Sequence, residues 1–337
     1  MHRLTLGEGN TPLEPWPSDQ RILLKREDTA PTGSHKDRAA SYQVARAVAL
    51  GARAIVISSS GNAGIATSRY AALHNIPAFV FVHPLTEPAK LAAIDGATTT
   101  LVITERAING AKLVARELGL PNLRPSVHDD ALVGYATLGD ELAAAAAAHQ
   151  TFTAVVLCAT SGGTAIAVAE VLAERCPGIA VHFVQGEGNA GLVDPDAVAS
   201  GSAAHSAAAG RLGVRRSRRA KQLQRAIAAT GGRGHIATTQ AVARAREELA
   251  ASGIVVSDES AANLSVAHEL VATGVGRVVC IISGAPPTPT GSPAQRITAS
   301  DEQDALAQIR ALLLAADVTS DGHVGRAPVR VCEADTQ

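Results

Sequence analysis

Lysine is rare in this sequence, and one lysine stands where its amine could act as a nucleophile. The lysines of the chain are Lys25, Lys36, Lys90, Lys112 and Lys221. Lys36 belongs to the segment PTGSHKDR at 31–38, in which proline and glycine favour a turn and Ser34 is a good helix N-cap. The helix dipole opposes a cation in the first helical turn and so favours the neutral amine that Schiff-base chemistry needs. Lys36 is therefore the candidate for covalent catalysis, with an ordinary exposed helical lysine as the alternative.

Three further turns follow apolar, β-branched segments and supply small polar residues. They are SSSGNAG at 58–64, TSGGT at 160–164, and Ser283 with Gly284. The glycines of TSGGT allow backbone N–H groups to approach a ligand closely, and a helix N-terminus favours an anion, so this turn predicts a phosphate site. It is not a nucleotide-binding P-loop, because no Gly-Lys-Ser/Thr follows it. Each of the three turns is also compatible with an ordinary connection between two elements.

These turns lie in a chain where short β-branched runs alternate with amphipathic stretches. The sequence predicts strands at 22–25, 54–58, 78–82, 98–104, 153–158, 180–185 and 277–282. It predicts helices at 34–50, 62–74, 87–95, 108–118, 133–148, 164–175, 240–251, 259–272 and 301–315. This alternation indicates parallel sheets with helices on both faces, which bind ligands at the carboxyl ends of their strands. A ligand is therefore expected at the turns that follow the strands.

The turns, in this order, resemble the fold type II pyridoxal-phosphate enzymes, the tryptophan synthase beta-like superfamily. The nearest resemblance is to threonine synthases. GEGNTPL at 7–13 is similar to their N-terminal motif, and LKRED at 24–28 followed by PTGSHKDR is similar to their lysine motif. SSSGNAG is also close to the serine/threonine dehydratases. The resemblance extends from about Leu6 to about Gly284, and motifs in a fixed order are far more specific than any one of them.

The resemblance implies an α/β fold with two open, mainly parallel sheets, flanking helices, and the cofactor pyridoxal 5′-phosphate between the lobes. Residues 1–45 and 142–337 would form the larger lobe, and residues 46–141 the smaller one, in a single interleaved catalytic unit. A homodimer is the expected assembly, and a small amino acid the expected substrate.

Residue roles also follow from the resemblance. Lys36 would form the Schiff base and move the proton at the substrate Cα, and Asn62 would bind the 3′ oxygen of the cofactor. Ser283 would face the pyridine nitrogen, and a neutral hydroxyl there suits elimination and replacement rather than transamination. The cofactor phosphate would bind to Thr160, Ser161, Gly162, Gly163 and Thr164. The substrate carboxylate would bind to Ser59, Ser60 and Gly61.

The sequence departs from threonine synthases at three places. His35 stands where they usually have phenylalanine, and tryptophan synthase beta chains have histidine there, so His35 is a candidate contact of the cofactor phosphate. Threonine synthases bind the substrate phosphate with an arginine near 126–137, whereas Ala131 or a neighbour stands there, and no arginine lies between Ser126 and Glu141. The glycine turn also lacks the asparagine of many threonine synthases. The last two departures argue against O-phosphohomoserine, although the basic cluster 215–219 is a candidate to compensate.

These features predict a lyase or synthase that eliminates or replaces a group at Cβ of an amino acid, through aldimine and aminoacrylate intermediates. The alternatives are threonine synthase proper, acting on O-phosphohomoserine, a serine/threonine ammonia-lyase, and a non-catalytic protein that binds the cofactor with Lys36 idle. GEGNAG at 186–191 matches GxGxxG, but Pro195 opposes a suitable helix start, so a nicotinamide site is a weaker alternative.

The composition of the chain indicates which classes of binding partner to expect. Apolar residues make up 46% of the chain and charged residues 18%, with a formal net charge of −1, which is typical of a globular protein and predicts neither nucleic-acid nor membrane binding. The cysteines show no CxxC spacing, so no metal site or disulfide framework is expected. Cys158 and Cys280 lie in apolar runs and are expected in the core. The N-terminus lacks the apolar segment of a signal peptide, which favours a cytoplasmic location.

Overall fold

Two sheets organise the computed structural model, which describes residues 4–148, 151–188, 190–193, 212, 216–288 and 293–321. The larger sheet has six strands in the order β1-β2-β9-β6-β7-β8. Their bounds are Leu13–Trp16 (β1), Asp19–Arg26 (β2), Val278–Ile282 (β9), Ala154–Cys158 (β6), Ala180–Gly186 (β7) and Gly234–Ala237 (β8). The β1 strand is antiparallel to β2, and every other neighbouring pair is parallel. The structure therefore confirms the predicted fold class.

The smaller sheet has four parallel strands in the order β10-β5-β4-β3. They span Gln295–Thr298 (β10), Thr99–Ile103 (β5), Ala78–Val82 (β4) and Ile55–Ser58 (β3). The β4 sequence AFVFV is buried at every position, as expected for a central parallel strand that is covered on both faces. The helices of this part are α2 (Asn62–Leu73), α3 (Pro88–Ala93), α4 (Ala107–Leu118) and α11 (Glu302–Asp321).

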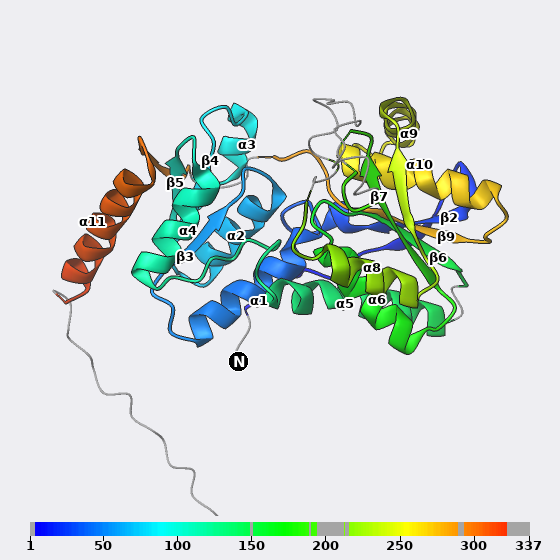
Figure 1. Ribbon diagram of the computed structural model, residues 1–337, viewed down its shortest axis with the longest axis horizontal. Coiled ribbons are helices and arrows are strands. Elements are labelled where there is room, and N and C mark those ends of the chain that lie inside the picture. The colour runs from blue at the N-terminus through cyan, green and yellow to red at the C-terminus, as the bar shows by residue number, and fades with distance from the viewer. Residues whose placement is uncertain are drawn as a thin grey trace, which may run out of the picture.

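Helices cover both faces of the larger sheet (Figure 1). One face carries α9 (Thr239–Ala251) and α10 (Asp258–Ala272), and the opposite face carries α5 (Asp130–Ala147), α6 (Gly163–Arg175) and α8 (Ala220–Ala229). Adjacent residues of a strand point to opposite faces, so Val156 belongs to the core beneath α10 and Val155 to the core beneath α6. None of the helices in the described ranges is long and apolar enough to cross a membrane.

Helix α1 (Lys36–Ala49) joins the two parts of the molecule. It follows β2 and the short 3-10 helix η1 (Glu27–Thr29), and it packs against both α2 and α5. Val44 and Tyr70 share a core on the α2 side. On the α5 side, a Cβ atom at Gly134 would lie 2.3 Å from the backbone oxygen of Arg38, so only glycine permits this close helix crossing. The first turn of α1 is therefore held against the larger part of the fold.

The lobe assignment needs correction at two places. Residues 142–337 were assigned to the larger lobe, but β10 pairs with β5 of the smaller sheet and α11 packs on α4. Strand β10 is only four residues long, so its sequence pattern gave little indication that the chain comes back to the smaller sheet. Helix α11 covers apolar residues that the smaller sheet would otherwise expose. Helix α5 was divided at 141, yet Leu138 and Leu142 pack together in the core of the larger sheet. The sequence also did not predict β1, β8 or α8.

Candidate active site

A cavity of about 710 Å³ lies at the carboxyl ends of parallel strands from both sheets. The sequence-predicted site residues that line it are His35, Lys36, Ser59, Ser60, Gly61, Asn62, Thr160, Ser161 and Ser283. The remaining predicted residues, Gly162, Gly163 and Thr164, directly follow Ser161 at the N-terminus of α6 and are not part of the cavity lining. Strand ends that are far apart in the sequence thus meet around one space.

Lys36 is the first residue of α1, and its amine contacts the preceding histidine. The Nε2 atom of His35 lies 2.8 Å from Lys36 Nζ, and its Nδ1 atom lies 2.9 Å from the carbonyl oxygen of Ser283. Because a carbonyl oxygen can only accept, we assign the proton to Nδ1, and Nε2 then accepts from the Lys36 amine. Burial, followed by the charge of Lys36, holds the pKa of His35 well below its ordinary value. His35 is therefore a neutral acceptor, and its contact with a phosphate stays a prediction.

Tyr135 of α5 packs next to Lys36 and His35. The Nζ atom of Lys36 lies 5.2 Å from the centre of the tyrosine ring, and the two rings of Tyr135 and His35 lie 5.7 Å apart between centroids. An amine at this distance from an aromatic face is in cation–π range when it is charged. The buried hydroxyl of Tyr135 has no hydrogen-bond partner among the described residues. No motif in the sequence pointed to this tyrosine.

Asp37 fixes the loop that precedes α1. Its buried carboxylate accepts hydrogen bonds from the backbone N–H and the hydroxyl of Thr32, the first of them at 2.7 Å. Burial raises the pKa of Asp37 to about 6, although the hydrogen bonds from Thr32 favour the ionised form. The carboxylate thereby ties the turn at Gly33, whose φ is 79°, to the helix that begins with Lys36.

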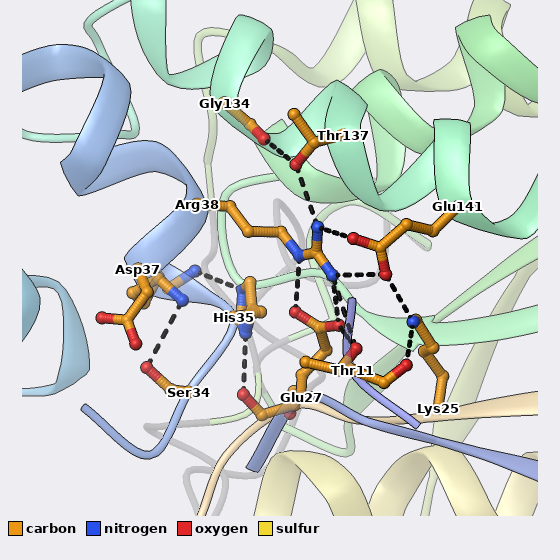
Figure 2. Close-up of polar contacts among 12 residues, drawn as sticks. Thr11, Lys25, Glu27, Ser34, His35, Asp37, Arg38, Gly134, Thr137 and Glu141 are labelled. Atoms are coloured by element: carbon orange, nitrogen blue, oxygen red, sulfur yellow. Dashed lines mark hydrogen bonds and ion pairs between the residues drawn. The ribbon is translucent and has the colours of Figure 1, made fainter. Parts of the chain in front are cut away.

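A buried ionic network lies beside the first turn of α1 (Figure 2). The guanidinium of Arg38 donates to Glu27 at 2.7 Å and to Glu141 of α5 at 2.8 Å. Lys25 of β2 donates to the same Glu141 at 2.6 Å. Burial alone would raise the pKa of Glu141, but the hydrogen bonds and charges of Arg38 and Lys25 outweigh it and lower that pKa to about 2. The network links α1, α5, β2 and η1 around the helix turn that carries Lys36.

Among the described residues, the first backbone N–H groups of α6, next to Ser161, have no hydrogen-bond partner. Gly162 is its N-cap and has a φ of 94°, a left-handed conformation that glycine adopts without strain. The first N–H groups of a helix have no partner within it and favour an anion. The carbonyl oxygen of Ser161 accepts from the hydroxyl of Ser217 at 2.8 Å, which holds the turn in place. A helix N-terminus beside the cavity is compatible with a phosphate site, and the phosphate contacts of this turn stay a prediction.

Ser283 and Asn62 bring the two sheets together at the cavity. The hydroxyl of Ser283 lies 3.3 Å from that of Ser260, and Ser260 also accepts from the N–H of Gly284 at 3.3 Å. In the described part of the chain, Ser283 therefore has hydroxyl and backbone neighbours and no carboxylate partner. A Cβ atom at Gly284 would lie 2.9 Å from Nδ2 of Asn62, so the amide from the smaller sheet packs directly on the end of β9.

Comparison with known proteins identifies the family. The family model described as "Pyridoxal-phosphate dependent enzyme" matches residues 4–284. The chain belongs to this family. Its cofactor is pyridoxal phosphate, in agreement with the predicted cofactor. The fold is that of the fold type II enzymes, as predicted.

The proteins that are similar to this pyridoxal-phosphate enzyme are named for different activities. A threonine synthase from Synechocystis is 33% identical over 32% of this chain and 32% of its own length, so the match spans about a third of that relative. A threonine synthase from Methanosarcina acetivorans is 28% identical over 83% of this chain and 75% of its own length. A human serine dehydratase-like protein is 32% identical over 39% of this chain and 43% of its own length. The crystal structure of an O-ureido-L-serine synthase has a TM-score of 0.71 at 19% identity, covering 82% of this chain and 89% of that one.

The donors around the cavity fit pyridoxal phosphate. The turn of Thr160 and Ser161 lines the cavity and leads directly into the N-terminus of α6, and Lys36 lines the same cavity. The neutral hydroxyl of Ser283 and the amide of Asn62 line it as well. The N-terminus of α6 matches an anion, and the Lys36 amine matches an aldehyde carbon. Ser283 and Asn62 match the polar atoms of a pyridine ring. The residues of this chain thus suit the cofactor of its family.

Cys158 was expected in the core, and this prediction was wrong in part. It ends β6, lines the cavity and is only partly buried, whereas Cys280 is fully buried as predicted. Burial of the sulfur, more than the nearby charge of Glu259, raises the pKa of the Cys158 thiol. The thiol stays protonated and is a weak nucleophile, so Lys36 is the better candidate for covalent chemistry.

The arginines of the basic cluster 215–219 lie in different surroundings. Arg216 and Arg218 are exposed and line the cavity, whereas Arg219 is buried and donates to Asp129 of the loop before α5 at 2.9 Å. Arg215 lies outside the described residues.

Two further cations line the cavity and were not predicted, Lys112 of α4 and Arg124. Arg124 stands two residues before the segment 126–137 in which threonine synthases have their phosphate-binding arginine, and this proximity is the signal that marks it in the sequence. In the sequence, only the scarcity of lysine distinguished Lys112 as a candidate site residue.

Proposed function

We propose that this chain is a pyridoxal-phosphate-dependent lyase or synthase that eliminates or replaces a group at Cβ of an amino acid. The observation that carries the proposal is that Lys36 lines the same cavity as Ser283, whose neutral hydroxyl lies 3.3 Å from that of Ser260. A hydroxyl facing the ring nitrogen leaves that nitrogen largely unprotonated, which favours elimination and replacement over transamination. The likeness to threonine synthases and to a serine dehydratase-like protein supports the same reaction class.

The proposed roles follow the geometry. When bound, pyridoxal phosphate supplies an electron sink that stabilises negative charge at the substrate Cα. Lys36 anchors the cofactor and then moves the Cα proton, and His35 orients its amine through the 2.8 Å contact. The cofactor phosphate binds to Thr160, Ser161, Gly162, Gly163 and Thr164, and its 3′ oxygen binds to Asn62. The substrate carboxylate binds to Ser59, Ser60 and Gly61.

The test is a spectrum combined with a substrate panel. Purified protein supplied with pyridoxal phosphate should show the visible absorption of a lysine-bound cofactor, and Lys36→Ala should abolish both that band and turnover. The panel is serine, threonine, O-acetylserine, O-phosphoserine and O-phosphohomoserine. Lys90→Ala is the matched control, because Lys90 pairs with Glu87 in α3 and does not line the cavity. An unchanged band or undiminished turnover in Lys36→Ala would overturn the proposal.

Threonine synthase proper is a second candidate, favoured by two of the relatives reported above. Against it, Ala131 is fully buried in a helix contact with Ala39 and Ala167, so the expected phosphate-binding arginine has no counterpart at this position. Release of threonine and phosphate from O-phosphohomoserine would establish this candidate. Release of ammonia and an oxo acid from serine or threonine would establish an ammonia-lyase instead.

The assembly and location of the protein are also proposals that rest on the resemblance. We expect a homodimer located in the cytoplasm. Sedimentation equilibrium of the cofactor-loaded protein should give twice the chain mass of 34.3 kDa. A mass of one chain at micromolar concentration would refute the dimer.

Retention of cofactor without turnover of any amino acid would favour a non-catalytic binding protein.

A further inference from the structure

The cavity carries more positive charge than its cofactor and a simple amino acid require. Its basic side chains are Lys36, Lys112, Arg124, Arg216 and Arg218. Among the described residues, Glu259 is the only carboxylate in its lining. A cavity lined mainly by one sign of charge concentrates ligands of the opposite sign. It therefore matters which anionic groups these basic side chains bind.

Arg124 is held by its backbone while its guanidinium remains unpaired. The N–H of Arg124 donates to the side chain of Asn122 at 3.2 Å, and its carbonyl oxygen accepts from the N–H of Val127 at 3.0 Å. In the described ranges of the chain, its guanidinium makes no hydrogen bond or ion pair. Burial lowers the pKa of this half-buried group. A partly desolvated cation without a counter-ion costs free energy, which an anionic ligand would recover.

Lys112 contributes a second cation to the lining of the same cavity from a different element. It lies on α4, whose Ala107 and Ile108 also line the cavity. Its amine has no ion pair in the described part of the chain, unlike Lys25 and Lys90. Two unpaired cations on separate elements of the smaller part can bind one anion from two directions.

The other cations already have anions assigned by position. Arg216 and Arg218 flank Ser217, whose hydroxyl binds the carbonyl of Ser161 at the phosphate end of the cavity. Lys36 is committed to the cofactor. Arg124 lies elsewhere, because the bridge between Val56 and Asn122 is parallel and places Arg124 level with Ser58, where the substrate-carboxylate turn begins.

We infer that Arg124 and Lys112 bind a second anionic group, a carboxylate or phosphate in the side chain of the substrate. This assigns the substrate to the amino acids that carry a negative charge beyond Cβ, and it rests on the proposed function. The α-carboxylate keeps its own donors in the serine and glycine turn. Arg124 is then a residue that sets substrate specificity, and Lys112 supports it.

Pairs of ligands that differ in charge test the inference in the cofactor-loaded enzyme. The turnover pairs are O-phosphoserine with O-acetylserine, and O-phosphohomoserine with O-acetylhomoserine. Aspartate and asparagine form the binding pair, measured by calorimetry. Wild type should prefer the charged member of at least one pair, and Arg124→Gln should reduce that preference by about 10- to 100-fold, through KM or Kd. Arg124→Lys should restore part of it. The phosphate and carboxylate pairs identify which anion is recognised.

The controls separate three outcomes. Arg116→Gln, in the exposed ion pair with Glu117 on α4, should leave every ratio unchanged. No charge preference in wild type, or equal losses for the charged and neutral members in Arg124→Gln, overturns the inference. A rise in the Kd of pyridoxal phosphate in Arg124→Gln, with the ligand ratios unchanged, overturns it too and assigns Arg124 to the cofactor. The proposed function fails separately, if Lys36→Ala retains the lysine-bound band and turnover.

Discussion

The Nε2 atom of His35 accepts a hydrogen bond from the Lys36 amine at 2.8 Å. The same ring is held at its other nitrogen by the carbonyl of Ser283, at 2.9 Å, so the end of β9 orients the lysine through the histidine. His35 is thus placed to position Lys36, and its contact with the cofactor phosphate stays a prediction.

Replacing His35 by phenylalanine separates the two roles. The variant retains the ring volume beside Tyr135 but removes the acceptor, so we expect kcat to fall by about tenfold while the Kd of pyridoxal phosphate changes by less than about threefold. Steady-state kinetics and cofactor titration measure the two quantities, and His35→Gln should restore part of kcat. A Kd that rises more than about tenfold with kcat intact would instead support the phosphate contact.

Gly284→Ala should weaken cofactor binding while the protein stays folded. The added methyl would lie 2.9 Å from Nδ2 of Asn62 and 3.1 Å from Cβ of Ser34, so the amide must move away from the cavity. We expect a loss of about 1 to 2 kcal/mol in cofactor binding and in stability. Gly61→Ala is the stability control, because its Cβ would meet nothing within 4 Å. Unchanged cofactor affinity in Gly284→Ala would show that Asn62 does not contribute to binding.

Asp37→Asn should change how stability depends on pH. The folded-state pKa is about 6 and the ordinary value is 3.8, so the unfolded chain loses this proton first as pH rises. Wild type therefore loses stability between these values, and the loss persists at higher pH. Relative to wild type, the variant should gain about 1 to 3 kcal/mol in unfolding free energy between about pH 4 and pH 7.

Urea titrations at several pH values measure this difference for Asp37→Asn. The lost hydrogen bond from Thr32 shifts the variant by a constant amount, so only the pH-dependent part tests the carboxylate. Glu247→Gln, at an exposed position of α9, should run parallel to wild type. A parallel curve for Asp37→Asn as well would contradict the raised pKa.

Glu141→Gln should destabilise the buried network with the opposite pH dependence. Its carboxyl pKa is lowered from 4.5 to about 2, so its contribution is complete above the ordinary pKa and is lost as pH falls through the folded value. At neutral pH we expect a loss of about 3 kcal/mol, because Lys25 and Arg38 remain buried with a missing counter-charge. Unfolding of both proteins at falling pH should bring their stabilities together. Glu14→Gln, in the partly exposed ion pair with Arg26, should cost less than about 1 kcal/mol.

The sequence predicted the strand-to-helix framework because β-branched runs and turn residues act locally. The chemistry at Lys36, Asn62 and Ser161 was recognisable because each lies in a short motif at the end of a predicted element. The cavity that gathers them agrees with that prediction, while their individual roles await the experiments above.

Other features depend on contacts between distant segments and had no local pattern. Tyr135 reaches Lys36 only because Gly134 allows α5 to approach α1 closely. Arg219 belongs to a basic cluster in the sequence, yet its partner Asp129 lies 90 residues earlier in the chain. Short strands such as β10 carry too few residues for an alternating pattern, so their sheet could not be assigned in advance.

The late return of β10 and α11 to the smaller sheet has a consequence for biosynthesis. Until residues 295–321 leave the ribosome, β5 is an unpaired edge, and the apolar face that Leu306 and Ile309 cover stays open to water. Exposed edges and apolar faces of this kind promote aggregation of incomplete chains. The smaller sheet therefore completes its folding only after residues 295–321 have been synthesised, although its other strands lie within residues 55–103, and truncation before Gln295 should yield an aggregation-prone product.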